Sequence, residues 1–565
     1  MARHRGSFER GRALERLATE PFDVLVVGGG ITGAGVVLDA ASRGLRAALV
    51  ERDDFASGTS SKSSKMVHGG IRYLQQGDIR LVYEALAERQ RLRKNAPHLV
   101  SILPFLLPIQ GKGGVVPRKL ARALGWAMWM YDLTGGLRIG RLHERLDADE
   151  VLAHMDTLPA ERIVGGYLYY DAEADDARLT LAIARTAALG FGAAVANRVG
   201  VAGFDKDPDG RITGARAVAD GAEIEIAASV VVNATGVWTD EVRTLDEGAD
   251  PEALRPAKGV HVTVPWSLVR NDIAVVVPVP GDKRTVFVVP WGDLTYIGTT
   301  DTDYDGPLDD PQCTPEDVAY LLGAVNASST NEITPADVVG TWAGLRPLVR
   351  GEGDERTADL SRQHRVTTSE SGLVTITGGK LTTYRRMADD TVDAVVGMLD
   401  GRARRRAGRS RTKRLRLVGA DGHEGLTETL AGHAHLDGGA IAHLVDRYGT
   451  EARVLVAMVD QDRSLADPLV EGLPYLRAEA VYAARYEMAR TVDDVLSRRT
   501  RARLLAAEAS AAAADDVAAL IAGDLGSDED DLRSQVSAYR AAVDAERAAA
   551  DLPAGAPAMA AAPAS

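Results

Sequence analysis

The sequence predicts a mixed α/β protein, α+β overall, in which a Rossmann-like domain, an antiparallel-sheet domain and a C-terminal helical domain are joined. Three observations predict this fold class. A glycine-rich turn stands between a short apolar strand and a helical stretch within residues 22–42. Residues 255–300 are rich in Val, Thr and aromatic residues with turn residues between them, which is typical of antiparallel strands. Residues 426–549 have a helical pattern with almost no β-branched runs.

The nucleotide-binding domain is expected to be discontinuous. A second strand that runs into a glycine turn, residues 230–236, follows a long excursion, and the arginine-rich run 402–416 interrupts the apolar periodicity. The predicted organisation is an N-terminal extension at 1–21; a nucleotide-binding domain at about 22–75, 170–257 and 345–390; an inserted substrate domain at about 76–169 and 258–344; a basic linker at 391–420; a helical domain at 421–549; and a disordered tail at 550–565.

Composition limits the function classes. A chain of 565 residues with 45% hydrophobic and 26% charged residues is large enough for two or three domains. The net charge of −14 argues against nucleic acid as a partner. Cys313 is the only cysteine, which excludes an internal disulfide and a dithiol centre. No apolar run approaches the ~20 residues that span a bilayer, and the charged residues 1–21 do not resemble a signal peptide, so a cytoplasmic location is expected.

A dinucleotide-binding motif opens the first βαβ unit. In the motif G-x-G-x-x-G, Gly28 permits the tight turn, Gly30 lets the backbone approach a pyrophosphate, and Gly33 allows close helix packing. Glu51 ends the second strand, where its carboxylate can accept hydrogen bonds from ribose hydroxyls. The residues predicted to contact the dinucleotide here are Gly28, Gly29, Gly30, Thr32, Gly33, Glu51 and Arg52.

The motif alone does not distinguish NAD from FAD. The run Asn233-Ala234-Thr235-Gly236 resembles the A-T-G element of FAD enzymes in the glutathione-reductase superfamily. This resemblance implies that FAD is the cofactor and that Ala234 and Gly236 lie against it.

Residues 58–74 are unusually polar for a core segment and read G-T-S-S-K-S-S-K-M-V-H-G-G-I-R-Y-L. This stretch is similar to one in the FAD-dependent glycerol-3-phosphate dehydrogenase family. Further segments match the family in the same order, so that the resemblance covers roughly residues 22–386: 175–179, 258–261, 290–291 with 298–301, 344–348 and 378–385. Residues 479–500 resemble the family's C-terminal domain more weakly.

The resemblance implies a set of site residues. His261 is the candidate base or proton relay, Arg346 is the candidate that polarises the substrate oxygen or holds the substrate, and Lys380 is placed beside the flavin or the substrate. Arg72, Tyr73, Arg346, Lys380 and Thr383 are expected around the substrate, because an acidic protein must bind a phosphate monoester through a local basic cluster. The further cofactor contacts implied are Thr59, Ser60, Ser61, Ser64, His68, Gly69, Gly379, Lys380 and Leu381. No metal site is predicted.

The expected reaction is oxidation of sn-glycerol 3-phosphate to dihydroxyacetone phosphate by hydride transfer to FAD N5, with electrons passed to a membrane quinone. Three alternatives stay open: an oxidase that uses dioxygen, an FAD-dependent amine or 2-hydroxy-acid oxidoreductase, and a flavin-binding regulatory protein without turnover. A quinone acceptor implies peripheral contact with the inner face of an anionic membrane. Residues 117–131, which mix basic and aromatic side chains, and the arginine run are the candidate surfaces. The oligomeric state stays open between monomer and homodimer.

Overall fold

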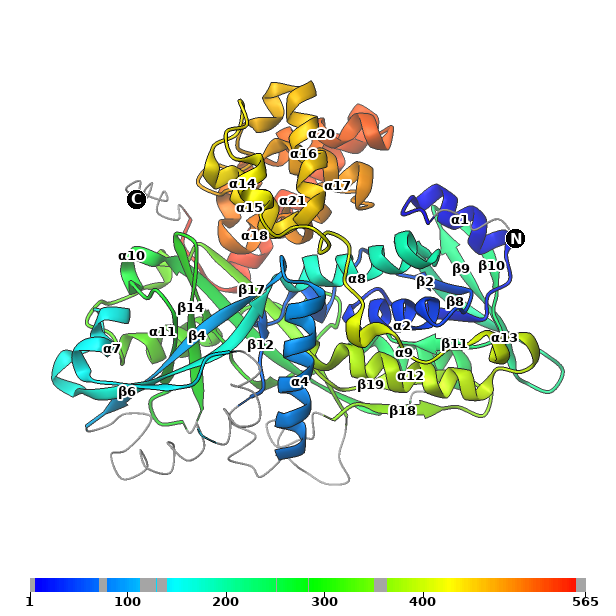
Figure 1. Ribbon diagram of the computed structural model, residues 1–565, viewed down its shortest axis with the longest axis horizontal. Coiled ribbons are helices and arrows are strands. Elements are labelled where there is room, and N and C mark those ends of the chain that lie inside the picture. Colours follow the sequence, from blue (N-terminus) through cyan, green and yellow to red (C-terminus); the bar gives the residue numbers. More distant parts are fainter. Residues whose placement is uncertain are drawn as a thin grey trace.

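The computed structural model describes residues 6–70, 79–111, 129, 140–249, 251–282, 284–349 and 363–554. Figure 1 shows two neighbouring β-sheet regions, with a cluster of helices lying across them. One region is formed around a parallel sheet at the right of the view and the other around a large, mostly antiparallel sheet at the left.

The parallel sheet has the strand order β18-β19-β11-β1-β2-β7, with only the edge strand β18 antiparallel to its neighbour. Its central strands are short and completely buried, as expected where helices cover a sheet. The helices α2, α8 and α12 pack together beside it (Figure 1). The elements are β1 (Val24–Val27), α2 (Ile31–Ser42), β2 (Ala47–Val50), α8 (Asp176–Phe191), β7 (Ala194–Ala196), β11 (Val231–Asn233), α9 (Thr239–Glu247), β18 (Arg365–Thr368), β19 (Val374–Thr377) and α12 (Tyr384–Met398).

The second sheet has the order β16-β12-β15-β14-β13-β4-β6-β3, with β17 also paired to β12 and β5 to β6. Helices α7 (Ala148–His154), α10 (Trp266–Val269) and α11 (Pro315–Asn326) belong to this region, and α4 (Ile79–Asn95) precedes its strand β4. Its strands are β3 (Met66–Val67), β4 (Val100–Gln110), β5 (Glu144–Leu146), β6 (Ile163–Ala174), β12 (Leu254–Pro265), β13 (Ala274–Pro278), β14 (Thr285–Trp291), β15 (Leu294–Gly298), β16 (Thr302–Asp303) and β17 (Gly340–Val349).

A small antiparallel sheet, β10-β9-β8, extends the nucleotide-binding region; its strands are β8 (Val199–Lys206), β9 (Ile212–Ala219) and β10 (Ala222–Ala227). The N-terminal helix α1 (Arg10–Thr19) packs on β10 and β7 and buries Leu17 completely. Residues 1–21 were expected as an extension without a role, but the part that the structure describes contributes to this core. The amphipathic spacing of Ala13 and Leu17 places both on the buried face.

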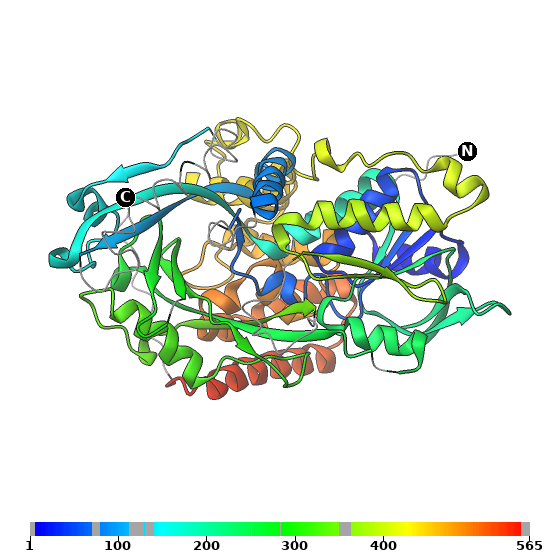
Figure 2. The same ribbon diagram turned by 90° about the horizontal axis from the view of Figure 1, so that it is seen from below.

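The C-terminal part consists of helices, as the sequence pattern predicts. They are α13 (Gly401–Arg406), α14 (Leu426–Leu430), α15 (Gly438–Tyr448), α16 (Ala452–Gln461), α17 (Arg477–Tyr486), a π-helix (Asp494–Arg499), α18 (Ala502–Leu505), α19 (Ala507–Ala512), α20 (Ala514–Leu525) and α21 (Glu529–Ala549). In the view from below, the long α21, drawn in red, runs along the lower edge of the picture (Figure 2).

Buried ion pairs join these helices to the nucleotide-binding region. Arg499 donates to both oxygens of Asp54, at 2.7 and 2.9 Å, and Arg178 on α8 donates to both oxygens of Glu487, at 2.8 and 2.7 Å. All four residues are buried. A buried charge is costly unless it is paired, so these contacts fix how the helical part meets the parallel-sheet region.

The structure changes two expectations at the margins of the domains. The basic run 402–416 is not a free linker, because Arg406 donates to Asp23 at 2.6 Å and Gly408 N donates to Arg43 O at 2.8 Å. The predicted tail at 550–565 begins later than expected, since Ala550 is buried and Leu552 packs against the core of the antiparallel sheet. Residues 555–565 lie outside the described part of the chain.

Candidate active site

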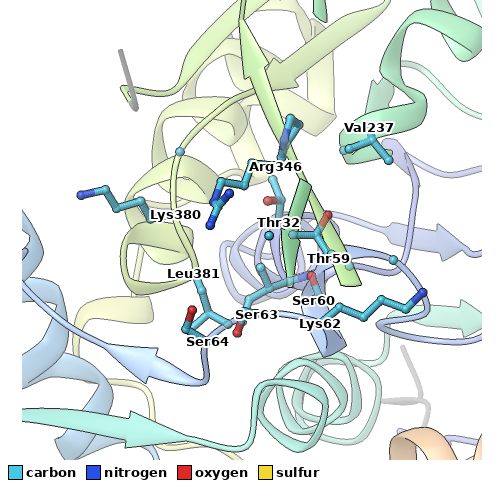
Figure 3. A pocket seen from close by; sticks show the side chains of 18 of the residues that line it. Thr32, Thr59, Ser60, Lys62, Ser63, Ser64, Val237, Arg346, Lys380 and Leu381 are labelled. Carbon is cyan, nitrogen blue, oxygen red and sulfur yellow. The ribbon is translucent and has the colours of Figure 1, made fainter. Parts of the chain in front are cut away.

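A cavity of about 1100 Å³ lies where the parallel and antiparallel sheets meet. Drug-sized ligands occupy pockets of about 300–1,000 Å³, so this cavity has room for a dinucleotide and a small substrate together. It is lined by the glycine-rich turn, the end of β2, residues 57–70, the turn after β11, strands β12 and β17, and residues 378–382. Figure 3 shows the hydroxyl-bearing Thr59, Ser60, Ser63 and Ser64 near Arg346, with Lys380 and Leu381 from the later segment at the same pocket.

The glycine turn meets the start of α2 at one end of the cavity. Gly28 has φ +108°, a region that favours glycine, and its Cβ would lie 2.7 Å from the Ala234 carbonyl oxygen. A Cβ on Gly33 would lie only 1.9 Å from Gly28 O, so Gly33 serves the packing of helix on turn. Gly30 and Thr32 line the cavity, and Ser60 Oγ accepts from Ile31 N at 2.9 Å. The start of α2 thus borders the cavity, where a helix N-terminus suits a phosphate group, although Ser60 already occupies the first amide.

Glu51 lies at the cavity wall where β2 ends. Its carboxylate accepts hydrogen bonds from Gly29 N at 2.6 Å and Asp53 N at 2.8 Å. Burial raises the pKa of Glu51 to about 7, although these two bonds favour the charged form. Together with the turn and the size of the cavity, this acceptor at the strand end fits the ribose and pyrophosphate of FAD.

The turn after β11 supplies the opposite wall. Ala234 and Gly236 line the cavity as predicted, and Thr235, Val237 and Trp238 line it too, although the sequence interpretation did not single them out. The buried Asn233 holds this turn, because its Oδ1 accepts from Thr235 Oγ1 at 2.7 Å.

Strand register assembles the substrate end. His261 on β12 is paired with Gly298 on β15 and with Trp342 on β17, while Arg346 on β17 is paired with Ala257 on β12. Because side chains alternate along a strand, Gly259, His261, Gly344 and Arg346 share one face, and all four line the cavity. A Cβ at 259 would lie 2.7 Å from Arg346 Nη2, so the glycine makes room for the guanidinium.

His261 is buried between its strand neighbours. Its ring lies parallel to that of Trp342, with centroids 4.6 Å apart, and a Cβ on Gly298 would lie 2.0 Å from its Cδ2. Nε2 is 2.8 Å from Ser64 Oγ, and Nδ1 has no hydrogen-bond partner among the described residues. Burial, and then the charges of Lys65 and Arg346, hold the pKa of His261 well below its usual value. The imidazole is therefore neutral at pH 7 and able to accept a proton.

Arg346 is held by oxygens on neighbouring elements. Nη1 donates to Asp301 Oδ1 at 2.9 Å, and Nη2 donates to Thr300 O at 3.3 Å and to Thr299 Oγ1 at 3.5 Å. Its side chain is 26% exposed and lines the cavity, so a positively charged group is presented to a ligand in an otherwise acidic protein.

The segment after β19 completes the cavity. Gly379, Lys380 and Leu381 line it, as predicted. Thr383 does not: it is buried, and its hydroxyl donates to Lys380 O at 3.3 Å, which stabilises the turn into α12.

Not every predicted site residue faces the cavity. Thr59, Ser60, Ser64, His68 and Arg52 line it. Ser61 is buried below the loop, and Gly69 N donates to Asp171 Oδ1 at 3.3 Å. Arg72 and Tyr73 lie outside the described residues. The cavity-lining polar residues that the sequence interpretation missed include Lys62, Ser63, Asp171, Arg284, Thr299 and Asp301.

No group of three or more His, Cys, Asp or Glu side chains in the described ranges could hold a metal ion. Cys313, expected to be a small buried hydrophobe, is buried and unpaired.

The comparisons with known proteins agree with this site. Residues 23–385 match the family described as FAD dependent oxidoreductase, and residues 410–532 match the C-terminal domain of alpha-glycerophosphate oxidase. Glycerol-3-phosphate dehydrogenase 2 of Mycobacterium tuberculosis is 42% identical over 539 residues, covering 94% of this chain and 90% of that protein. The human mitochondrial glycerol-3-phosphate dehydrogenase is 39% identical, covering 90% of this chain and 71% of that protein.

Solved structures agree with the fold. The glycerol-3-phosphate dehydrogenase of Bacillus halodurans, complexed with FAD, superposes with a TM-score of 0.75 at 30% identity, covering 96% of this chain and 97% of that one. The FAD-bound L-alpha-glycerophosphate oxidase of Mycoplasma pneumoniae, at 17% identity and a TM-score of 0.53 over 67% of this chain and 95% of that one, shares the fold alone.

The FAD-type cavity, the two matched family segments and the relatives that match over nearly the whole chain lead to one assignment: the protein is an FAD-dependent oxidoreductase and belongs to the glycerol-3-phosphate dehydrogenase family.

Proposed function

We propose that this protein oxidises sn-glycerol 3-phosphate to dihydroxyacetone phosphate and passes the electrons to a membrane quinone. One observation carries the proposal. His261 and Arg346 lie on the same face of paired strands, separated by glycines, at the end of a cavity whose other end has the features of a dinucleotide site. The names of the most similar relatives supply the substrate.

When bound, FAD supplies the acceptor for the hydride that leaves the carbon of a secondary alcohol. His261 takes up the hydroxyl proton, because burial keeps its imidazole neutral and Ser64 Oγ, 2.8 Å from Nε2, lies at the cavity wall as a relay. Removing this proton makes the alcohol a better hydride donor.

Arg346 binds and orients the anionic substrate. A phosphate monoester carries nearly two negative charges, and a guanidinium can contact a phosphate oxygen or the reacting oxygen through paired N–H groups. Arg346 Nη1 donates to Asp301 Oδ1 at 2.9 Å, so the guanidinium has a fixed direction before the substrate binds. Lys380 lines the same cavity and adds a second positive charge.

The membrane part of the proposal rests on surfaces rather than on a spanning segment. Among the described residues, no helix is both long and apolar enough to cross a bilayer. Residues 117–131 lie outside the described part except for Trp129, whose side chain is 53% exposed. The arginine run offers exposed basic residues at 402, 404 and 405, which suit an anionic headgroup surface.

Dioxygen is the second candidate acceptor, and the match of residues 410–532 to the C-terminal domain of alpha-glycerophosphate oxidase favours testing it. The purified protein is mixed anaerobically with sn-glycerol 3-phosphate, and the flavin absorbance at about 450 nm is followed. A quinone analogue or oxygen is then added. Loss of absorbance that quinone reverses quickly and oxygen slowly supports the dehydrogenase, fast recovery with oxygen supports the oxidase, and no loss of absorbance contradicts the substrate.

A further inference from the structure

The buried cation Lys65 shares an aromatic neighbour with His261. Its side chain is 4% exposed, and Nζ lies 4.6 Å from the centroid of the Trp342 ring. The same indole stacks on the His261 imidazole, with centroids 4.6 Å apart and planes inclined by 8°. Trp342 is itself fixed, because its Nε1 donates to Ser63 O at 3.1 Å. The Lys65 ammonium, the indole and the imidazole therefore form one packed group.

Fixed acceptors hold the ammonium in place. Lys65 Nζ lies 3.2 Å from Ser61 O and 3.5 Å from each carboxylate oxygen of Asp176. Asp176 is fully buried and also accepts from Arg501 Nη2 at 3.0 Å and from Ser63 Oγ at 2.7 Å. Arg501 Nε also lies 3.7 Å from Asp175 Oδ1, so two cations face two carboxylates, and the Lys65 ammonium is the charge of this buried cluster that lies beside Trp342.

We propose that Lys65 is a positioning residue for proton transfer, which packs with His261 on Trp342 and whose charge adds to the effect of burial in opposing protonation of the imidazole before the substrate delivers its proton. The proposal rests on the proposed role of His261 as the proton acceptor. Lys65 need not contact the substrate. We expect it to act on His261 through its charge and through its packing on Trp342.

The charges around His261 and Lys65 determine the direction in which Lys65 shifts the pKa of His261. The cations that act on His261 are Lys65 and Arg346, and both lower its pKa further after burial has done so. Lys65 in turn is acted on by Arg501, Asp175 and Asp176, and burial lowers the pKa of Lys65 to about 8. Lys65 therefore carries its charge at pH 7, where it opposes a second positive charge on the imidazole.

The test uses neutral replacements of Lys65 in the FAD-loaded enzyme. Lys65→Met removes the charge, Lys65→Gln removes it but retains a donor for Ser61 O and Asp176, and Lys65→Arg retains the charge. Lys206→Met is the control, since Lys206 also pairs with a carboxylate, Asp246 at 2.8 Å, but lies in the small sheet away from the cavity lining. The acidic limb of kcat/KM for sn-glycerol 3-phosphate is measured from pH 8 down to the lowest pH at which the protein stays folded, and the His261 ring titration is followed by NMR of the histidine-labelled protein over the same range.

In the neutral variants we expect the His261 titration and the acidic limb to move to higher pH by at least half a pH unit, with the wild-type position kept in Lys65→Arg and Lys206→Met. A uniform loss of kcat with an unmoved titration would assign Lys65 a structural role only and overturn the proposal. If the wild type does not turn over sn-glycerol 3-phosphate, the proposed function fails, while the NMR titration still decides whether Lys65 acts on His261. The His261 signal is assigned by its loss in His261→Gln.

Discussion

Arg346 Nη1 donates a 2.9 Å hydrogen bond to Asp301 Oδ1, and both residues line the cavity. The Asp301 side chain is 8% exposed and that of Arg346 is 26% exposed, so the carboxylate lies behind the guanidinium and leaves part of it accessible. This pair fixes the direction of a cation at the substrate end of the cavity.

We expect Arg346→Ala to lower kcat/KM for sn-glycerol 3-phosphate by about 100-fold or more, because loss of a charge-assisted contact to a bound anion costs about 2–5 kcal/mol. Asp301→Asn should have a smaller effect, since the guanidinium remains but is less firmly directed. Steady-state kinetics measure both. Flavin content should stay at the wild-type level, and turnover of Arg346→Ala close to wild type at low substrate would contradict the assignment.

His261→Asn should lower kcat by about 10²–10⁴-fold, the usual contribution of a positioned general base. In the wild type, the lowered pKa of His261 means that the base is protonated only below pH 6.5, so activity should fall on the acidic side of that value. The second ionisation of the phosphate, near pH 6, adds its own limb. We expect the acidic fall in activity that is due to His261 to disappear in His261→Asn. An unchanged pH profile in that variant would exclude His261 as the base.

Two substitutions in the glycine turn distinguish an effect on cofactor binding from an effect on stability: Gly30→Val and Gly33→Ala. A Cβ at residue 30 meets only Ser60 Oγ at 3.1 Å, so the variant should fold but lose FAD through the branched side chain at the pyrophosphate position. A Cβ at residue 33 would lie 1.9 Å from Gly28 O, so that variant should be strongly destabilised even without cofactor. Flavin-to-protein ratio and thermal unfolding of the apo-proteins measure the two effects; full flavin in Gly30→Val would refute the proposed cofactor position.

Glu51 gives a pH-dependent prediction. Burial raises its pKa from 4.5 to about 7, so the folded apo-protein holds this proton more tightly than the unfolded chain does. The wild type should therefore lose stability relative to Glu51→Gln as the pH rises from about 4.5 to about 7, by at most about 1.4 kcal/mol per pH unit, with a constant difference above that. Urea unfolding of both apo-proteins between pH 5 and pH 8 measures it. A difference independent of pH would show that the carboxyl titrates normally.

Arg499→Met should destabilise the protein by about 3–5 kcal/mol, because Asp54 would lose two of its hydrogen bonds while remaining buried. Two bonds to Asp54 remain, from Arg498 Nε to Oδ2 at 2.7 Å and from Asn197 Nδ2 to Oδ1 at 3.0 Å, and they place the expected value toward the lower end. Adding Asp54→Asn should recover part of the loss. Arg402→Met, at an exposed position, is the control and should change stability by less than about 0.5 kcal/mol. Equal unfolding midpoints for Arg499→Met and Arg402→Met would contradict a stabilising role for the pair.

The sequence predicted those elements whose structure depends on contacts between residues close together in the chain. The strand, glycine turn and helix at residues 22–42 could be predicted because each glycine has a steric task within a few residues of its own position, and the Cβ distances at residues 28 and 33 agree with those tasks. The segment 58–70 was predicted as a polar lining, and of the residues named as cofactor contacts Thr59, Ser60, Ser64 and His68 line the cavity, whereas Ser61 and Gly69 do not. Ser61 and Gly69 turn away from the cavity lining while Lys62 and Ser63 join it, because contacts with distant residues such as Arg501 and Asp171 orient the loop.

The sequence by itself determined the nucleotide-binding motif, the helical C-terminal part and the resemblance that led to the family. Only the tertiary structure decided which side chains meet. Ser64 and His261 are 197 positions apart in the chain, and Lys65 and Asp176 are 111 apart, yet each pair is within hydrogen-bonding distance. Strand register and the burial of paired charges bring these residues together. Neither can be recognised from a short sequence pattern, because both depend on the packing of segments that are far apart in the chain.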